Sequence, residues 1–170
     1  MLIECNIEDH LHFMEDDPVR PDLFRDDTRR FQGPFRVFAD VDEEGNPNAV
    51  ICVVLTSFIP KDETELWKLS AGELLLLDQD DGELYELDGD PTVLCPYSVW
   101  SYGRGHGRQL INDLIDMAPI SFPTVECVVT MSPTSRKVMG FHLGNGAEVV
   151  AYNESTINYG YEVAEDVVLH

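Results

Sequence analysis

The spacing of apolar side chains predicts two strands joined by a turn in the first third of the chain. Phe35–Asp40 alternates in polarity and is rich in aromatic and β-branched residues, which is typical of a strand. Ala49–Phe58 is almost continuously apolar, as a strand covered on both faces would be. Between them, Glu43–Asn48 contains residues that favour turns. We therefore expect a β-hairpin here.

The second half of the chain alternates strand-like and helix-like patterns. A glycine-rich turn precedes a segment whose apolar residues fall on one helical face. Gly144–Gly146 supplies a stop for the helix before it. In order, the expected elements are a strand over Thr92–Trp100, a turn and helix over Gly103–Ala118, a strand over Thr124–Met131, a helix over Pro133–Leu143, and closing strands over Ala147–Tyr152 and Ile157–Val163.

Two regions have weaker patterns. Ile7–Arg30 is polar and acidic, and Pro18 and Pro21 interrupt its loosely helical spacing, so we expect two short helices rather than one long one. Lys61–Leu69 is a candidate for a further short helix. A second, acidic hairpin is expected from the flanking segments Glu73–Leu77 and Glu83–Leu87.

Length and composition indicate one domain of ordinary globular character. The chain has 170 residues, 44% apolar and 25% charged, and one sizeable core is feasible at this length. No apolar run approaches the ~18 residues of a membrane span, and Met1–His10 lacks the apolar segment of a signal peptide. The cysteines stand far apart, which indicates reduced core residues in a cytoplasmic protein. They are Cys5, Cys52, Cys95 and Cys127.

The unusual feature is the charge. There are 32 acids and 11 bases, a formal net charge of −21, which argues against direct binding to nucleic acid or to an anionic membrane. Residues 1–90 carry 24 of the acids and 7 of the bases, so most of the negative charge lies there. The four bases of the second half form two short clusters, which either hold an anion or are solvated surface residues. They are Arg104 with Arg108, and Arg136 with Lys137.

A glycine-rich turn between a predicted strand and a predicted helix is the sharpest candidate for chemistry. Glycines let a backbone approach a ligand closely, and the unpaired N–H groups of a helix start bind anions. The pattern is neither a P-loop, since no Lys-Ser or Lys-Thr follows, nor a Rossmann fingerprint, whose glycine spacing differs. A flexible turn that caps the helix is the alternative. The turn consists of Tyr102, Gly103, Arg104, Gly105, His106, Gly107 and Arg108.

This strand, turn and helix resemble the acyl-CoA pyrophosphate loop of the GNAT superfamily of N-acetyltransferases. That motif is Arg or Gln, two residues, Gly, one residue, then Gly or Ala; Gly105 and Gly107 match it, and Tyr102 replaces the Arg or Gln. Phe141–Ala147 is similar to the family's second motif, an aromatic pair, two residues, then Asn-Gly-Phe. The resemblance spans Thr92–Tyr152. It implies an α/β (α+β) fold with a mostly antiparallel sheet, splayed at the cofactor site and flanked by helices.

The resemblance also implies a single domain over residues 1–170. Its parts are a variable helical region over 1–34, a hairpin and acidic insertion over 35–91, the acyl-CoA-binding core over 92–152 and a closing strand over 153–170. In such a fold the strand around Tyr97–Val99 would splay from its neighbour and present a backbone N–H to the thioester carbonyl. Arg136 and Lys137 would meet the 3′-phosphate of CoA or face solvent.

Two side chains make the resemblance more specific. His142 stands where many of these transferases place a Tyr that protonates the departing CoA thiolate, and an imidazole can serve as that acid. Ser132 and the stretch through His142 are similar to the catalytic region of malonyl-CoA decarboxylase. By this resemblance Ser132 and His142 are the catalytic residues, and the turn from Tyr102 to Arg108 binds acetyl-CoA or another acyl-CoA.

The leading hypothesis is therefore acyl transfer from CoA to an amine that attacks the thioester directly. The acidic first half would suit a cationic amine, either a small molecule or a protein lysine. Two alternatives stay open: a small malonyl-CoA decarboxylase-like enzyme, and a non-catalytic acidic protein that targets a basic host protein, as small copies of this kind resemble phage-encoded proteins. No metal is expected, because His10, His12 and Cys5 lack a fourth ligand at suitable spacing.

Overall fold

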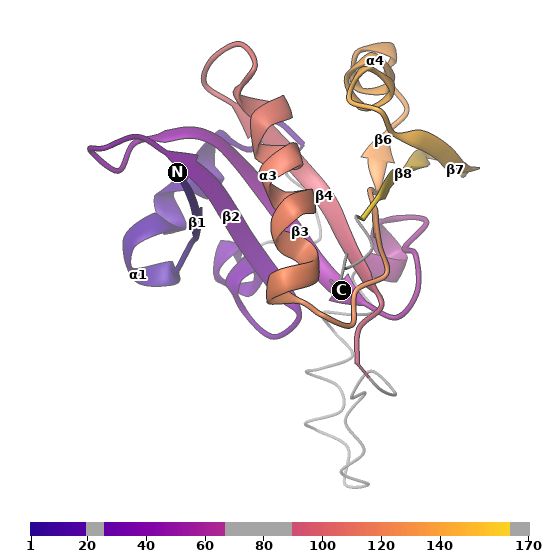
Figure 1. Ribbon diagram of the computed structural model, residues 1–170, viewed down its shortest axis with the longest axis horizontal. Coiled ribbons are helices and arrows are strands. Elements are labelled where there is room, and N and C mark those ends of the chain that lie inside the picture. Colours follow the sequence, from indigo (N-terminus) through magenta and orange to yellow (C-terminus); the bar gives the residue numbers. More distant parts are fainter. Residues whose placement is uncertain (20–25, 67–89, 164–170) are drawn as a thin grey trace, which may run out of the picture.

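The computed structural model describes residues 1–19, 26–66 and 90–163, and in these ranges the chain forms one mixed sheet with helices on its faces (Figure 1). The sheet has eight strands in the order β1-β2-β3-β4-β5-β8-β6, with β7 paired to β8. The pairing of β4 with β5 is parallel, and every other pairing is antiparallel. The expected fold class is therefore confirmed.

The first four strands form a continuous antiparallel layer. The strand β3 is buried from Ala49 to Thr56, which explains its unbroken apolar sequence. The β2–β3 turn is held by Asp42, whose carboxylate accepts from the backbone N–H groups of Glu44 and Asn46, both at 2.9 Å. The bounds are Leu2–Glu4 for β1, Phe35–Val41 for β2, Pro47–Thr56 for β3 and Val93–Ser101 for β4.

The later strands extend the sheet beyond β4. The strand β8 pairs on one side with β5 and then with β6, and on the other side with β7. The bounds are Cys127–Val129 for β5, Ser132–Pro133 for β6, Glu148–Tyr152 for β7 and Thr156–Glu162 for β8.

Helix α3 (His106–Ser121) crosses one face of the sheet over β3 and β4 (Figure 1). Its buried stripe includes Leu110, Leu114 and Ala118, which recur at helical spacing. Helix α4 (Arg136–Gly144) is capped by Ser135. The hydroxyl of Ser135 accepts from the Val138 N–H at 3.1 Å and so satisfies one of the free donors of the first turn.

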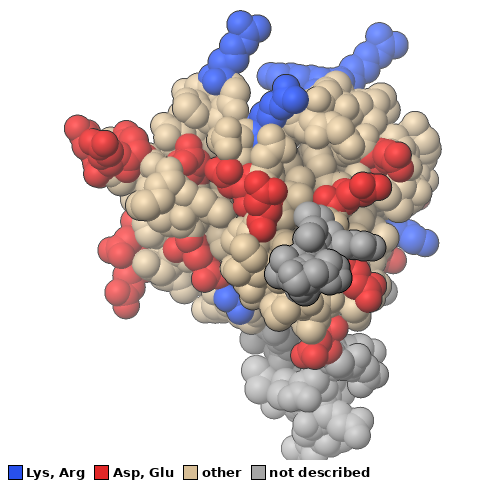
Figure 2. All heavy atoms as spheres, viewed as in Figure 1, with Lys and Arg blue, Asp and Glu red and all other residues tan. Residues whose placement is uncertain are grey.

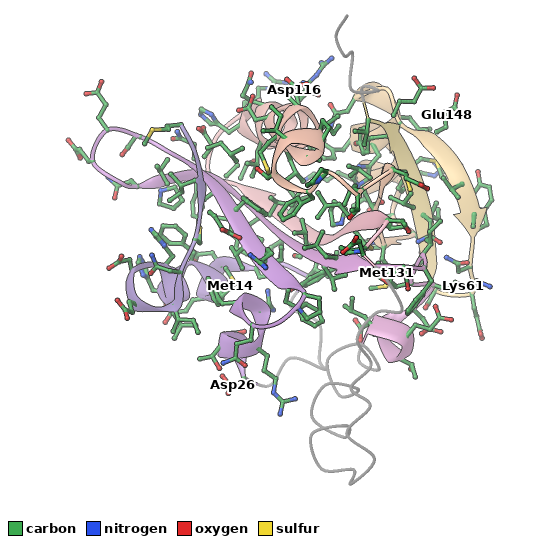
Figure 3. The ribbon with its side chains drawn as sticks, turned by 60° about the horizontal axis from the view of Figure 1, so that its bottom comes forward. Met14, Asp26, Lys61, Asp116, Met131 and Glu148 are labelled. Carbon is green, nitrogen blue, oxygen red and sulfur yellow. The ribbon has the colours of Figure 1, made fainter. Side chains whose placement is uncertain are left out.

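The opposite face of the sheet is covered by short helical pieces of the N-terminal segment. They are α1 (Ile7–His10) and the 3₁₀ helices η1 (Leu11–Asp16) and η2 (Asp27–Phe31). Figure 3 shows Met14 of η1 and Asp116 of α3 on opposite sides of the sheet. The buried side chains accordingly form two clusters, one on each face.

Most expected elements are present, and the differences have local causes. The helical region of Ile7–Arg30 is largely 3₁₀, a form common in short pieces. The strand expected over Thr124–Met131 is paired only at Cys127–Val129, because the sheet opens there. The helix expected from Pro133 begins instead at Arg136, since Ser132 and Pro133 pair with β8.

Other expectations concern segments and side chains outside these elements. The acidic hairpin expected from residues 73–87, and the end of the helix expected over Lys61–Leu69, lie outside the described residues. No helix within the described ranges is long and apolar enough to cross a membrane. No group of potential metal ligands is found in the same ranges. All four cysteines are free, and three of them are buried.

Packing of α3 on the sheet is open to a direct test. Leu114 is fully buried on the helix, so Leu114→Ala should lower the free energy of unfolding by about 2–5 kcal/mol through lost transfer energy and the cavity left behind. Asp116→Ala, two residues along on the exposed side, should change it by about 0.5 kcal/mol or less. Urea denaturation of both variants measures this, and equal costs would contradict the packing.

Candidate active site

The sheet opens between β4 and β5. The two strands pair only at Val93 with Cys127 and at Leu94 with Val128, and one further bond joins the Met131 N–H to the Pro96 carbonyl at 2.9 Å. Beyond that point β4 continues along β3, and no strand of the described residues pairs with its other side. The expected splay of the sheet is thus present.

A bulge in β4 lies where the opening begins. Cys52 of β3 pairs with Ser98, and the next residue, Val53, pairs with Pro96, so Tyr97 is the extra residue. A proline in a central strand is ordinarily excluded because it has no N–H to donate, and a bulge is one of the places that tolerate it. Pro96 therefore fits a strand that is leaving its neighbour.

The opening contains a small cavity of about 50 Å³. Side chains from β3, β4, α3 and α4 surround it together with the segment Thr130–Pro133 and a residue of the N-terminal region. Its lining residues are Val19, Ile51, Pro96, Tyr97, Ser98, Val99, Ile111, Thr130, Ser132, Pro133, Val138 and His142.

The backbone of Val99 faces this opening. The Tyr102 N–H donates to the Asn48 carbonyl at 2.9 Å, toward β3, and antiparallel partners alternate between hydrogen-bonded and non-hydrogen-bonded pairs. By this alternation Val99, opposite Ile51, is a non-hydrogen-bonded position whose N–H points away from β3. A backbone donor therefore lies at the rim of the cavity.

Ser132 and His142 meet at the cavity wall. The distance between Ser132 Oγ and His142 Nε2 is 3.2 Å, and Ser132 Oγ donates to Thr130 Oγ1 at 2.8 Å. Ser132 is on β6 and His142 on α4, so the contact joins two elements ten residues apart in sequence. The structure brings the two predicted catalytic side chains together.

The imidazole of His142 is enclosed and held on every side. It is 2% exposed, stacks on the ring of Tyr159 with centroids 4.7 Å apart, and its Nδ1 lies 2.7 Å from the hydroxyl of Tyr161. Burial lowers the pKa of His142 from 6.5 to about 4, because the charged imidazolium loses its hydration. His142 is therefore neutral at pH 7.

The partners of His142 fix which ring nitrogen carries the proton. Ser132 gives its one hydrogen to Thr130 and therefore accepts from His142. Burial raises the pKa of Tyr161 to about 12, against a smaller opposing effect from Asn145, so its hydroxyl is protonated and donates to Nδ1. The neutral ring then holds its hydrogen on Nε2 and donates to Ser132. A directional chain of hydrogen bonds thus runs from Tyr161 through His142 and Ser132 to Thr130.

A buried asparagine anchors this chain to the backbone. Asn158 is fully buried, and its amide donates to the carbonyls of Thr130 and Pro60, each at 2.9 Å. The backbone N–H of Tyr159 donates to Thr130 Oγ1 at 3.2 Å. Buried polar groups are costly unless they are hydrogen-bonded, and these satisfy one another.

The glycine-rich turn forms the start of α3. Gly105 is the N-cap residue with φ of +86°, a left-handed conformation that favours glycine. Gly107 is buried, and a Cβ there would lie 3.5 Å from the ring of Phe141 on α4. A Cβ on Gly103 would lie 2.8 Å from the ring of His106, which indicates that His106 shapes the turn. The first N–H groups of a helix have no intrahelical partner, so the turn presents donors.

Basic side chains surround this end of the molecule. Figure 2 shows Lys and Arg side chains gathered along the upper edge, where Figure 1 places the turn before α3 and the helix α4. The exposed bases of these two elements are Arg104, Arg108, Arg136 and Lys137.

Tyr102 is turned toward the N-terminal region. Its phenol donates to Asp16 at 2.6 Å and accepts from the indole N–H of Trp100 at 3.2 Å. The side chain thus ties β4 to η1, and its contact with a cofactor stays a prediction.

Sequence reasoning missed several residues of the site. Thr130, Tyr161, Asn158 and Ser98 all lie in or beside apolar runs, and a polar residue at a core-type position is the signal that could have found them. Within the described ranges, no carboxylate is among the residues that line the cavity. The carboxylate of Asp17 lies behind Ser98 and accepts from its hydroxyl.

Known proteins resemble this chain in structure more than in sequence. No family model matches the chain, and no curated protein matches it. Solved structures do. Malonyl-CoA decarboxylase from Rhodopseudomonas palustris is 15% identical with a TM-score of 0.65; the match covers 96% of this chain and 60% of that one. The chain thus spans only part of that enzyme's length.

Two acetyltransferases match along almost their whole length. A GNAT-family acetyltransferase from Listeria monocytogenes is 12% identical with a TM-score of 0.58, covering 95% of this chain and 94% of that one. An aminoglycoside acetyltransferase, AAC(6')-Ib, in complex with coenzyme A and kanamycin, is 15% identical with a TM-score of 0.59 and the same coverage. Malonyl-CoA decarboxylase itself has a GNAT-like fold. With its sheet open between β4 and β5 and a glycine turn before α3, the chain has the GNAT fold.

Proposed function

We propose that the protein is an acyl-CoA-dependent N-acyltransferase that works in the cavity between β4 and α4. The observation that carries the proposal is the hydrogen bond of Ser132 with His142 on the wall of that cavity. Structural similarity to acetyltransferases supports it.

The residues at the upper edge fit the phosphates of CoA. In a protein of net charge −21, Arg104 and Arg108 flank a helix start whose N–H groups suit a pyrophosphate. Arg136 and Lys137 stand exposed in the first turn of α4 and suit the 3′-phosphate. Gly107 has no side chain to obstruct a ligand beside Phe141.

Acyl transfer follows from the groups that face the cavity. The amine nitrogen attacks the thioester carbonyl carbon, and the carbonyl oxygen, which gains negative charge, is stabilised by the Val99 N–H. When the carbon–sulfur bond breaks, the thiolate takes a proton through the chain of Ser132 and His142, and Tyr161 can resupply His142 at Nδ1. The amine attacks in its neutral form and loses one proton to solvent as the amide forms, and Tyr161 takes one proton back from solvent, so that protons and charge balance.

The amine class is proposed from charge and from similar proteins. The surface of the chain is strongly acidic, which raises the local concentration of cations. One similar structure is an agmatine N-acetyltransferase and another holds kanamycin; both names denote amine compounds. Since the cavity lining carries no carboxylate in the described ranges, the acidic surface acts on approach rather than on the bound amine.

A second activity, decarboxylation of malonyl-CoA, is favoured by the same Ser132–His142 contact, because it matches the predicted resemblance to malonyl-CoA decarboxylase. In that reaction the bond to the carboxylate breaks, carbon dioxide leaves, and the electron pair remains as an enolate. The enolate carbon would then take a proton from the His142 chain. The similar proteins named here are enzymes, and they lend no support to the third reading, a non-catalytic acidic protein.

Thiol release distinguishes these reactions. Wild-type protein with acetyl-CoA and agmatine or kanamycin should release CoA, and His142→Ala should lower kcat by about 100-fold or more, as loss of a general acid does. His12→Ala replaces an exposed histidine of η1 and should leave the rate unchanged. Carbon dioxide release from malonyl-CoA without an amine would instead assign decarboxylation. Equal rates for His142→Ala and wild type would contradict both.

The buried neutral state of His142 has a consequence for stability. Its pKa is about 4 in the folded protein and 6.5 for an ordinary histidine. Below pH 6.5 the unfolded state therefore binds the extra proton, and stability decreases as the pH is lowered. Between about pH 7.5 and pH 5, this should remove about 2 kcal/mol of unfolding free energy.

The measurement is urea denaturation of wild type and His142→Gln at both pH values. Other groups titrate in both proteins, so the difference between the two proteins in how the free energy of unfolding changes with pH isolates the contribution of His142. A stability difference that does not change with pH would contradict a buried neutral imidazole.

A further inference from the structure

The wall of the cavity nearest the N-terminal segment carries a second chain of hydrogen bonds. Ser98 of β4 lines the cavity and is 4% exposed, and its hydroxyl donates to Asp17 Oδ1 at 2.6 Å. The other oxygen of Asp17 accepts from Arg30 Nη1 at 2.6 Å. The side chains of Asp17 and Arg30 are fully buried.

This arrangement fixes the direction of the Ser98 hydroxyl. Asp17 receives three donors, from Ser98, from Arg30 and from the backbone N–H of Val19 at 2.8 Å. A carboxylate surrounded by donors beside a guanidinium acts as an acceptor. A serine hydroxyl has one hydrogen, and here it points at Asp17. Toward the cavity Ser98 therefore presents only lone pairs.

Arg30 stabilises the buried carboxylate of Asp17 as a hydrogen-bond acceptor. Removing a buried carboxylate from water is costly unless it is paired, and Arg30 supplies the opposite charge together with contacts to the sulfur atoms of Met14 and Cys52. Arg30 Nε also lies 3.5 Å from Asp27 Oδ1, so Arg30 is shared between two carboxylates. Asp17 and Arg30 are thus positioning residues that act through Ser98.

We propose that Ser98 binds the amine substrate by accepting a hydrogen bond from its N–H group. This deepens the proposed function and rests on it. Ser98 immediately precedes Val99, whose N–H points into the opening, so the amine donor and the carbonyl oxygen would be bound by adjacent residues of one strand. The ligand class at this wall is a hydrogen-bond donor, a primary amine or ammonium, and a carboxylate is disfavoured because its oxygens would face the lone pairs of Ser98.

The Ser98 side chain is opposed across the same cavity by the chain of Ser132 and His142. On that wall the donors run from His142 Nε2 to Ser132 and on to Thr130. The two walls differ in what surrounds each serine: Ser132 lies between an imidazole and a second hydroxyl, whereas Ser98 is bound to a carboxylate. This difference assigns proton delivery to one wall and amine binding to the other.

The test uses two small probe ions, methylammonium chloride and sodium acetate, each compared with sodium chloride at equal ionic strength. The readout is the NMR amide signals of Ser98 and Val99. Methylammonium should shift both signals saturably in wild type, and acetate should shift neither. In Ser98→Ala the apparent Kd for methylammonium should rise about fivefold or more, the size expected for one lost hydrogen bond.

Thr28→Ala is the matched control. Thr28 also donates its hydroxyl to an aspartate, Asp26, at 2.7 Å, but on an exposed helix outside the cavity. Its response to methylammonium should equal that of wild type. Ser98→Cys, which keeps the size of the side chain but is a weak acceptor, should behave like Ser98→Ala and serves if the alanine variant does not fold.

The outcomes separate this assignment from the proposed function. The assignment is overturned if acetate binds at Ser98, if methylammonium gives no saturable shift, or if the Ser98 variants bind methylammonium with the wild-type Kd. Each of these results overturns it even where amine-dependent thiol release proceeds. Saturable methylammonium binding that weakens in the Ser98 variants supports it, and if no amine releases CoA from such a protein, it is the transfer function that fails.

Discussion

The site depends on β4 holding its pairing with β3 while it leaves β5. The bulge at Tyr97 and the proline before it mark the point where β4 leaves β5, and the Met131 N–H still donates to the Pro96 carbonyl there. A sheet that stayed closed would pair the backbone of Val99 with a neighbouring strand. Because it opens, one backbone donor and side chains from five elements, β3, β4, β6, α3 and α4, face a shared cavity.

An opening through the middle of a sheet places polar groups where apolar packing is expected. On each wall these groups have different hydrogen-bonding partners. On one wall His142, Ser132 and Thr130 satisfy one another, and Asn158 holds Thr130 in place. On the other wall Asp17 is neutralised by Arg30 and orients Ser98. Paired groups are stable in a low-dielectric interior, where unpaired ones are costly. The lining of the cavity is mostly apolar and carries no charged side chain. Its polar side chains include Ser98, Thr130, Ser132 and His142, and each of these four is hydrogen-bonded.

The same features divide the molecule into a part that we propose binds the phosphates of CoA and a part that we propose selects the amine. The basic residues and N–H groups at the starts of α3 and α4 form the edge that we propose binds the phosphates of CoA, in contrast to the acidic remainder of the chain (Figure 2). The N-terminal segment supplies Asp17 and Arg30, so it determines the wall that we assign to the amine. These two parts come from opposite faces of the sheet, and the opening is where they meet.

The sequence was sufficient for the strands and helices whose patterns are long and regular, such as β3 and α3, and for the pairing of Ser132 with His142 by resemblance. It could not indicate the 3₁₀ form of the N-terminal pieces, because short helices depend on tertiary packing more than on local propensity. The partners of the site were missed for a related reason. Asp17, Arg30 and Ser98 are far apart in the sequence, and only the fold shows that the first two are buried behind the third.

The central claim is that the opening between β4 and β5 holds the acyl-CoA, with the phosphates at the glycine turn. A crystal structure of the protein with CoA tests this most directly. We predict that the pantetheine chain lies between β4 and the Thr130–Pro133 segment, with its sulfur near Ser132 and His142 and its pyrophosphate on the N–H groups before α3. CoA bound on another surface, or a cavity that stays empty at saturating CoA, would contradict the account.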